Sequence, residues 1–76
     1  MPLFKINVIN EHFTSSDEYD LPTVQVARNQ AIKGALQIGA GEVGEENPFF
    51  GAEVIVESDG ERLARFIVSI GVSPLQ

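Results

Sequence analysis

Cysteine is absent from the sequence, which excludes both disulfide bonds and thiolate metal sites. With 76 residues, the chain is predicted to form a single domain, 1–76. A domain of this size buries only about 60 % of the surface that its unfolded chain exposes. Because neither a disulfide nor a structural zinc adds stability, we expect association with a second copy, most simply as a homodimer.

Basic residues are scarce: 5 Lys and Arg stand against 11 Asp and Glu, giving the chain a net charge of −6. Binding to nucleic acid or to an anionic membrane surface needs clustered basic side chains, so we expect neither as a partner. No apolar run approaches the roughly 20 residues that span a bilayer. The start MPLFKINV lacks the charged region and long apolar core of a signal peptide. These features predict an acidic cytoplasmic protein.

Candidate catalytic and metal-binding residues are also few. Without cysteine or a G-x-S-x-G setting for serine, the sequence offers no recognisable nucleophile with its base. The one histidine, His12, has Asp17, Glu18 and Asp20 nearby, which would allow a weak metal site. A solvated histidine is the favoured interpretation, because these carboxylates match no calcium-loop pattern. We therefore predict no enzyme, catalytic residue or metal site, with a small-ligand or metal-binding enzyme as an alternative.

The segment GAGEVG, residues 39–44, matches the G-x-G-x-x-G pattern of dinucleotide-binding loops. In those proteins the glycines follow a strand and open a helix, whose N-terminus meets the pyrophosphate. Here they follow an expected helix, and Glu42, Glu45 and Glu46 would repel a phosphate. We expect the glycines to end the helix near Gly39 and to begin a loop over 39–49, and we expect no cofactor.

Alternating and helical patterns give the order of elements. Residues 3–9 alternate as a strand, Asn10-Glu11 suits a turn, residues 12–14 a short return strand and residues 15–20 a polar connection. Thr23 is the expected N-cap of a helix. The expected buried stripe of this helix is mostly alanine and consists of Val24, Ala27, Ala31, Ala35 and Ile38. Ile32 and Leu36 lie on its flank and either cover the rim of the core or meet something outside it.

Two further alternating segments, 50–57 and 61–70, flank Ser58-Asp59-Gly60 and predict a second hairpin. A three-residue loop would pair Glu57 with Glu61 and keep the apolar residues on one face, whereas a two-residue loop would put Val54 opposite Arg65. We therefore expect the three-residue loop. The resulting fold class is α+β, with order ββαββ: an antiparallel four-stranded sheet carrying one helix on one face. Strand order within the sheet does not follow from the sequence.

The sheet face opposite the helix is the predicted interaction surface. Apolar side chains mixed with charge are expected there, namely Leu3, Ile9, Ile55, Leu63, Arg65 and Ile67. In the alternatives, the segment 71–76 folds over this face, or its apolar residues stay exposed. We predict a non-enzymatic protein-interaction module that self-associates through this face or through a sheet edge.

Three segments together resemble a family of small proteins from rhizobia and related alphaproteobacteria. They are MPLFKINV, DLPTVQVARNQAI and the pattern F-G-x-x-V-x-V-x-x-D-G that ends at Gly60. The family is catalogued as a domain of unknown function, so the resemblance implies a bacterial cytoplasmic origin and no established activity. The chain departs from the family at Asn10-Glu11, where members often have Asp-Gly, and at Tyr19, where they often have glycine.

The first hairpin and the helix also resemble HicB-type antitoxins, whose helix likewise begins at threonine and carries alanines at four-residue intervals. Thr23, Ala27, Ala31 and Ala35 match that pattern here. This resemblance implies an alternative function, in which an acidic module inhibits a basic protein partner. No segment of the sequence matches the DNA-binding part of such antitoxins.

Overall fold

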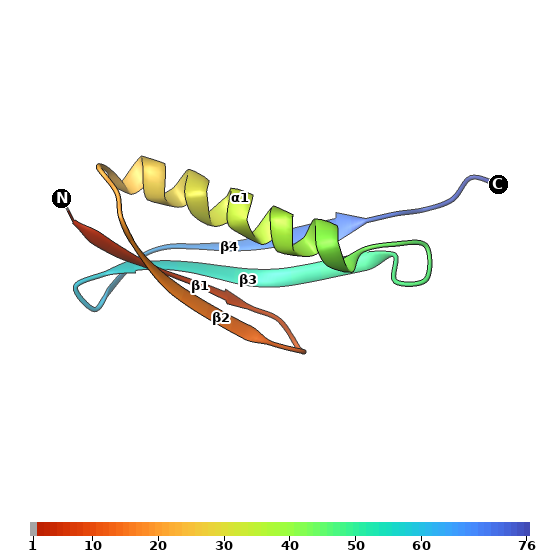
Figure 1. Cartoon of the computed structure of the whole chain (residues 1–76), viewed down its shortest axis with the longest axis horizontal. Coiled ribbons are helices and arrows are strands. Elements are labelled where there is room, and N and C mark those ends of the chain that lie inside the picture. The colour runs from red at the N-terminus through yellow and green to blue at the C-terminus, as the bar shows by residue number, and fades with distance from the viewer. Residues whose placement is uncertain (1) are drawn as a thin grey trace.

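The computed structural model describes residues 2–76, so Met1, the first residue of the expected domain 1–76, lies outside it. The elements follow in the expected order ββαββ (Figure 1). They are β1 (Leu3–Ile9), β2 (Thr14–Asp20), α1 (Val24–Glu42), β3 (Phe49–Ser58) and β4 (Glu61–Gly71). The predicted fold class, an α+β domain with an antiparallel four-stranded sheet and one helix, is confirmed.

The strands lie in the order β2-β1-β3-β4, which leaves β2 and β4 at the edges. Contrary to expectation, residues 15–20 do not form a connection: β2 pairs with β1 along its whole length, from Leu3 opposite Asp20 to Ile9 opposite Thr14. A polar segment is tolerated there because an edge strand keeps much of its surface in water. The chain then crosses through α1 from β2 to β3.

Thr23 is the N-cap of α1, as predicted: its hydroxyl oxygen accepts a hydrogen bond from the Val26 N–H, at 3.1 Å. The helix does not end near Gly39, however, but continues to Glu42. Gly39 is buried, and a Cβ atom there would lie 2.6 Å from Ile70 Cδ1 and 2.7 Å from Phe50 Cδ2. Gly39 therefore allows close approach of the helix to the sheet, which offsets its low helix propensity.

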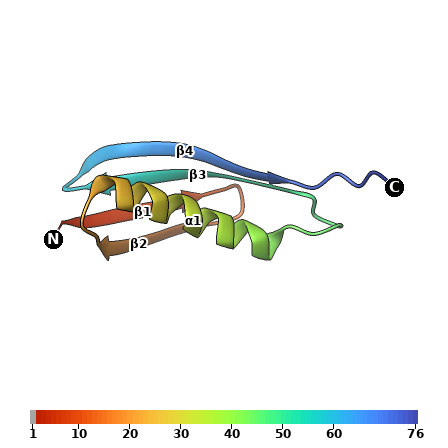
Figure 2. The ribbon, with the colours of Figure 1, turned by 90° about the horizontal axis from the view of Figure 1, so that it is seen from above.

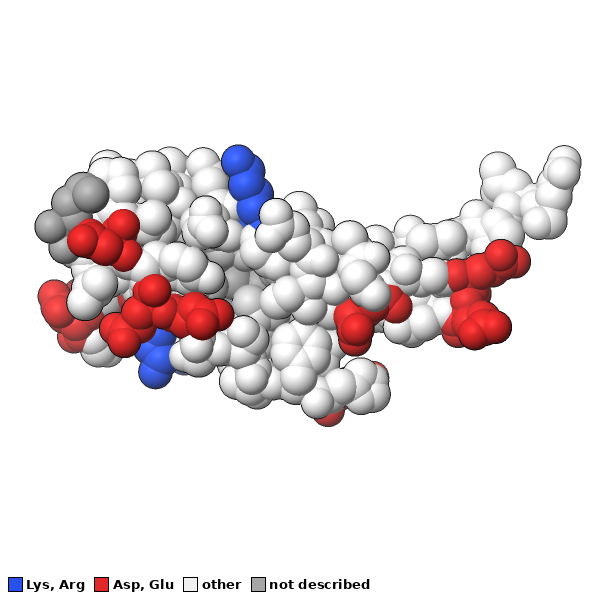
Figure 3. All heavy atoms as spheres, in the orientation of Figure 1, with Lys and Arg blue, Asp and Glu red and all other residues white. Residues whose placement is uncertain are grey.

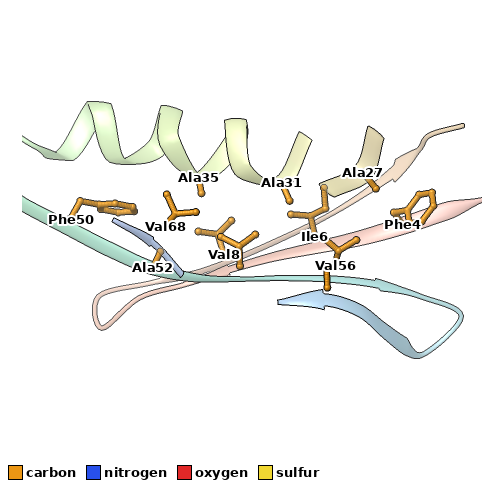
Figure 4. Packing of buried hydrophobic residues seen from close by; sticks show 12 residues of the cluster. Phe4, Ile6, Val8, Ala27, Ala31, Ala35, Phe50, Ala52, Val56 and Val68 are labelled. Atoms are coloured by element: carbon orange, nitrogen blue, oxygen red, sulfur yellow. The ribbon is translucent and has the colours of Figure 1, made fainter. Parts of the chain in front are cut away.

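The core lies between α1 and one face of the sheet (Figure 4). Four small residues at four-residue spacing form the buried stripe of α1, which consists of Ala27, Ala31, Ala35 and Gly39. The sheet contributes larger side chains, with Phe4, Val54 and Val56 almost fully enclosed. We call this covered side of the sheet the front face and the other side the reverse face. As predicted, one helix covers one face.

The β3–β4 hairpin differs from its predicted register. Its loop has two residues, Asp59 and Gly60, both with positive φ (52° and 77°), as a type I′ turn requires. Ser58 is opposite Glu61, but beyond a bulge Val56 is opposite Ala64, so Leu63 is the extra residue on β4. A two-residue loop alone would turn the apolar residues of β4 to the wrong face, and the bulge restores them to the core.

The molecule is elongated, with principal extents of 49 × 21 × 16 Å. Part of this length comes from residues 72–76, which continue beyond β4 and end far from the strands β1 and β2 (Figures 1 and 2). This segment bonds to the preceding loop, where the Val72 N–H donates to the Pro48 carbonyl at 2.8 Å. It does not fold over the reverse face, so that alternative is excluded. Among residues 2–76, no helix has the length and apolar character needed to cross a membrane.

Candidate interaction surface

The predicted surface residues do not form one exposed apolar patch on the reverse face. Ile55 is buried, with 8 % of its surface exposed, whereas Ile67 is 75 % exposed and Leu3 is 56 % exposed. Leu63 packs against the core cluster, because the bulge at this position removes it from the strict alternation that the sequence suggested. Ile9 is half-buried. The exposed apolar groups of this face are therefore separated.

Charged side chains occupy the space between them. Lys5 of β1 is opposite both Glu18 of β2 and Glu57 of β3, and Glu57 is in turn opposite Arg62 of β4. Opposed residues of antiparallel strands share a face, so the charges alternate in sign across all strands of the sheet. Opposite charges placed across neighbouring strands in this way favour the observed register. This charged row crosses the reverse face next to the β3–β4 turn, and Lys5, Glu18 and Arg62 in it are exposed.

Arg65, another predicted surface residue, is exposed and forms an ion pair with Glu53. It lies directly opposite Ile55, so the ion pair runs beside this buried side chain. Because the aliphatic part of an arginine side chain covers apolar neighbours, Arg65 helps to explain why Ile55 is buried on a face that no helix covers. Arg65 is therefore part of the polar covering of the reverse face.

Strand β4 gives the molecule an extended open edge. It is 11 residues long, and in the part of the chain that the structure describes no strand pairs with its outer side. Charge is confined to its first half, at Glu61, Arg62 and Arg65, and the segment from Phe66 to Gly71 contains no charged residue and no proline. Natural edge strands are commonly protected by charge, proline or short length, and this half of β4 has none of these.

The flank of α1 above β4 is also apolar. The Arg28 guanidinium carbon lies 5.0 Å from the centre of the Phe66 ring, which places this side of the helix next to β4. Ile32 and Leu36 follow at four-residue spacing on the same side. Leu36 is 42 % exposed, and Phe66 and Ile70 below it are half-buried. Ile67 of the same edge strand points to the reverse face. We call the open edge lined by Ile32, Leu36, Phe66 and Ile70 on the front side and by Ile67 on the reverse side the β4 surface.

The other edge strand, β2, is different in every respect. It is 7 residues long, reads TSSDEYD, and carries Asp17, Glu18 and Asp20 without a basic residue. All three are exposed. Figure 3 shows acidic side chains along the lower part of the molecule, whereas the side formed by α1 is nearly uncharged. A second β2 strand would bring carboxylates close to carboxylates, so this edge opposes pairing with its own copy.

His12 lies in the first hairpin turn, where its Nε2 is 3.2 Å from Glu11 Oε1 in an exposed pair. The carboxylates considered as its partners do not converge on His12. Asp17 points to the front face, whereas Glu18 and Asp20 point to the reverse face. Asp20 is also about 20 Å along β2 from Thr14, at the far end of the strand from the turn. Among the described residues, no group of three or more histidine and acidic side chains is placed to hold a metal ion.

A hollow of about 290 Å³ lies next to this turn. The turn contributes Glu11 and His12, and the segment after α1 contributes Asn47, whose Nδ2 donates to the Glu42 carbonyl at 2.9 Å. The glycines of GAGEVG do not line a phosphate loop, because Gly39 and Gly41 belong to the last turns of α1.

Comparison of the chain with family models, with curated proteins and with solved structures gave no match. The two resemblances noted in the sequence therefore stay predictions.

The sequence indicated part of the β4 surface. The flank residues Ile32 and Leu36 stand out by their helical spacing, and Ile67 by alternation. Phe66 and Ile70 lie on the front face, and they are only half-buried because β4 is an edge strand. The signal that was missing is strand order, which depends on long-range pairing rather than on any local pattern.

Proposed function

We propose that this protein is a non-enzymatic interaction module that works by self-association. The observation that carries the proposal is the β4 surface, where an uncharged stretch of edge strand and an apolar helix flank are exposed side by side. Both an open backbone edge and an apolar patch favour association, since pairing satisfies the backbone and burial removes apolar area from water.

The surface area of the chain supports this proposal. Its accessible surface is 5211 Å² at a mass of 8.3 kDa. A folded monomer of that mass is expected to expose about 4,600 Å², so the excess is about 600 Å². Part of the excess belongs to the extended segment 72–76. A standard protein interface covers about 800 Å² per subunit, so the elongated chain has enough exposed surface for one interface of that size.

The test is sedimentation equilibrium of the full chain over a wide range of concentration. We expect a monomer–dimer equilibrium whose dimer is populated at micromolar concentration. A chain that sediments as a monomer up to millimolar concentration would contradict self-association, because the β4 surface would then bind too weakly to serve as an interface.

A second candidate function, inhibition of a basic protein partner, is favoured by the acidic edge strand. The exposed carboxylates Asp17, Glu18 and Asp20 follow one another along β2. A strand with this charge suits pairing with a basic strand or a basic surface, and such attraction accelerates association at low salt. Affinity capture from the native host at low and high salt tests this role. A basic protein retained only at low salt is the expected result, and capture that is insensitive to salt would contradict it.

A further inference from the structure

We propose that two copies join through β4, antiparallel about a two-fold axis at Val68, so that both sheets become one continuous sheet and the two α1 helices pack side by side upon it. This inference rests on the proposed self-association and specifies its geometry. The occupant of the β4 surface is thus a second copy of this chain.

The position of α1 over the sheet supports the arrangement. The helix packs on β3 and β4 to a similar extent, and less on β1. Its axis therefore lies about half a strand spacing inside β4, and the two-fold axis would lie half a spacing outside β4. With strands about 4.8 Å apart, the axes of the two helices would then be about 10 Å apart. Packed helices have interaxial distances of about 8–10 Å, so pairing the strands also brings the helices into contact.

The residues along α1 determine where the axis passes. Arg28 lies over Phe66, and Gly39 lies against Ile70, so the helix segment between them lies above the strand segment between them. A two-fold axis at Val68 places Ile32 of one copy near Leu36 of the other. In β4 it places Phe66 opposite Ile70. Half-buried apolar side chains of each copy would thus complete a shared core on the front face.

The charges of β4 are compatible with this register. Arg65 would be opposite Gly71 and Arg62 opposite Pro74, so no two like charges are directly opposed. On the reverse face Ile67 would be opposite Ser69. Pairing through β2 would instead bring two acidic strands together. An isologous contact at β4 also closes on itself, leaving the acidic edges outermost, where they oppose further growth of the sheet.

The absence of cysteine allows a direct test of the geometry, because Ser69→Cys and Thr14→Cys each introduce one site for a nitroxide spin label. Both residues are exposed, and both face the reverse side. In the proposed dimer the Ser69 positions are close to the axis, about 10 Å apart or less. The Thr14 positions are at opposite edges, separated by about seven strand spacings, or about 34 Å. Electron paramagnetic resonance measures both distances.

A short Ser69 distance together with a long Thr14 distance supports the arrangement. A dimer with a short Thr14 distance, or with a long Ser69 distance, overturns it while leaving self-association intact. A monomer at all concentrations overturns both the arrangement and the proposed function. If the label at Ser69 itself prevents association, the Thr14 distance decides the question.

A matched pair of helix variants tests the proposed contact between the two α1 helices. Leu36→Glu is expected to raise the dissociation constant of the dimer at least about 100-fold, because each dimer carries the change twice and loses leucine burial at both sites. Gln37→Glu adds the same charge one position away, on the outer side of α1, and is expected to change the constant less than about 3-fold. Circular dichroism and thermal unfolding confirm that both variants fold. Equal effects of the two substitutions on the dissociation constant would overturn the proposed contact between the helices.

Discussion

The two edge strands of the sheet differ in length, charge and covering. β2 has 7 residues, carries three acidic side chains and lies beyond the helix, whereas β4 has 11 residues, is uncharged over its second half and is partly covered by α1. Both edges expose backbone hydrogen-bonding groups, so the difference lies in the side chains beside them. β2 has the features that prevent pairing, and β4 has those that permit it.

This difference is the basis of the proposed mode of assembly. A small sheet with two open edges would polymerise, and one with two protected edges would stay monomeric. In the proposed dimer, one open edge and one protected edge would limit assembly to a pair. Four changes test this comparison in order of decreasing expected effect: at the packing of α1 on β4, at an exposed side chain of β4, at the acidic side chains of β2, and at the cation of α1 that lies over Phe66.

Replacing Gly39 by valine should have the largest effect, because it forces α1 away from β4. The added side chain would overlap Ile70 and Phe50, whose atoms lie within 2.7 Å of the position of a Cβ. Overpacking of this kind is expected to lower the free energy of unfolding by about 3 kcal/mol. Chemical denaturation measures the loss. Gly41→Ala is the control, since no atom lies within 4 Å of its Cβ position and helix propensity should improve; similar losses in both variants would contradict the packing role of Gly39.

The substitution Ile67→Lys should make β4 resemble a protected edge. Ile67 is 75 % exposed, so the substitution leaves the fold intact. In the proposed dimer two such lysines lie near the two-fold axis, and we expect the dissociation constant to rise by about 10- to 30-fold. Sedimentation equilibrium measures it. Thr14→Lys, on the same face at the other edge, should leave dimerisation unchanged, and a comparable weakening there would show that β4 is not the interface.

Neutralising the acidic edge should convert β2 into a second open edge. The double variant Asp17→Asn and Glu18→Gln is expected to keep the dimer and to add tetramers and larger species at high concentration, because charge no longer opposes strand pairing. Light scattering after size exclusion detects these species. Glu45→Gln with Glu46→Gln removes the same charge from the loop after α1 and should not produce them. Larger species in both variants would mean that net charge, rather than the β2 edge, limits assembly.

The smallest effect is expected for the contact that fixes the helix flank over β4. Removing the cation by Arg28→Gln should lower the free energy of unfolding by about 0.5–1 kcal/mol, since the guanidinium lies over the Phe66 ring. A double-mutant cycle with Phe66→Leu isolates this coupling. Lys33→Gln, on the exposed side of α1, is the matched control. A cycle with no coupling would show that the stacking adds nothing to stability.

Local pattern was sufficient to predict the order of elements, the cap at Thr23 and the assignment of residues to the front face. It failed at residues 15–20, where a polar segment forms a full strand because it pairs along its whole length with the apolar strand β1. It also failed at Gly39, where tertiary packing overrides helix propensity. Both errors have the same origin: the deciding interaction is with residues distant in the sequence.

For the interaction surface, the sequence predicted the reverse face, and the structure shows why that prediction was incomplete. Alternation correctly placed Ile55 and Ile67 on that side, but burial of Ile55 depends on its neighbours across the strands, which sequence spacing does not give. That β4 is an edge strand follows from strand order alone. The β4 surface could therefore be recognised only after the strands were placed.

The bulge at Leu63 also limits how this hairpin can change over evolution. With a two-residue turn, the count of residues between Val56 and Ala64 decides whether the rest of β4 shows its apolar side chains to the helix or to water. Deleting Leu63 alone would invert every later position of the strand, whereas the same deletion combined with one added turn residue would restore them. Insertions and deletions in this hairpin should therefore be inherited in compensating pairs, and a library of length variants selected for folding would reveal that rule.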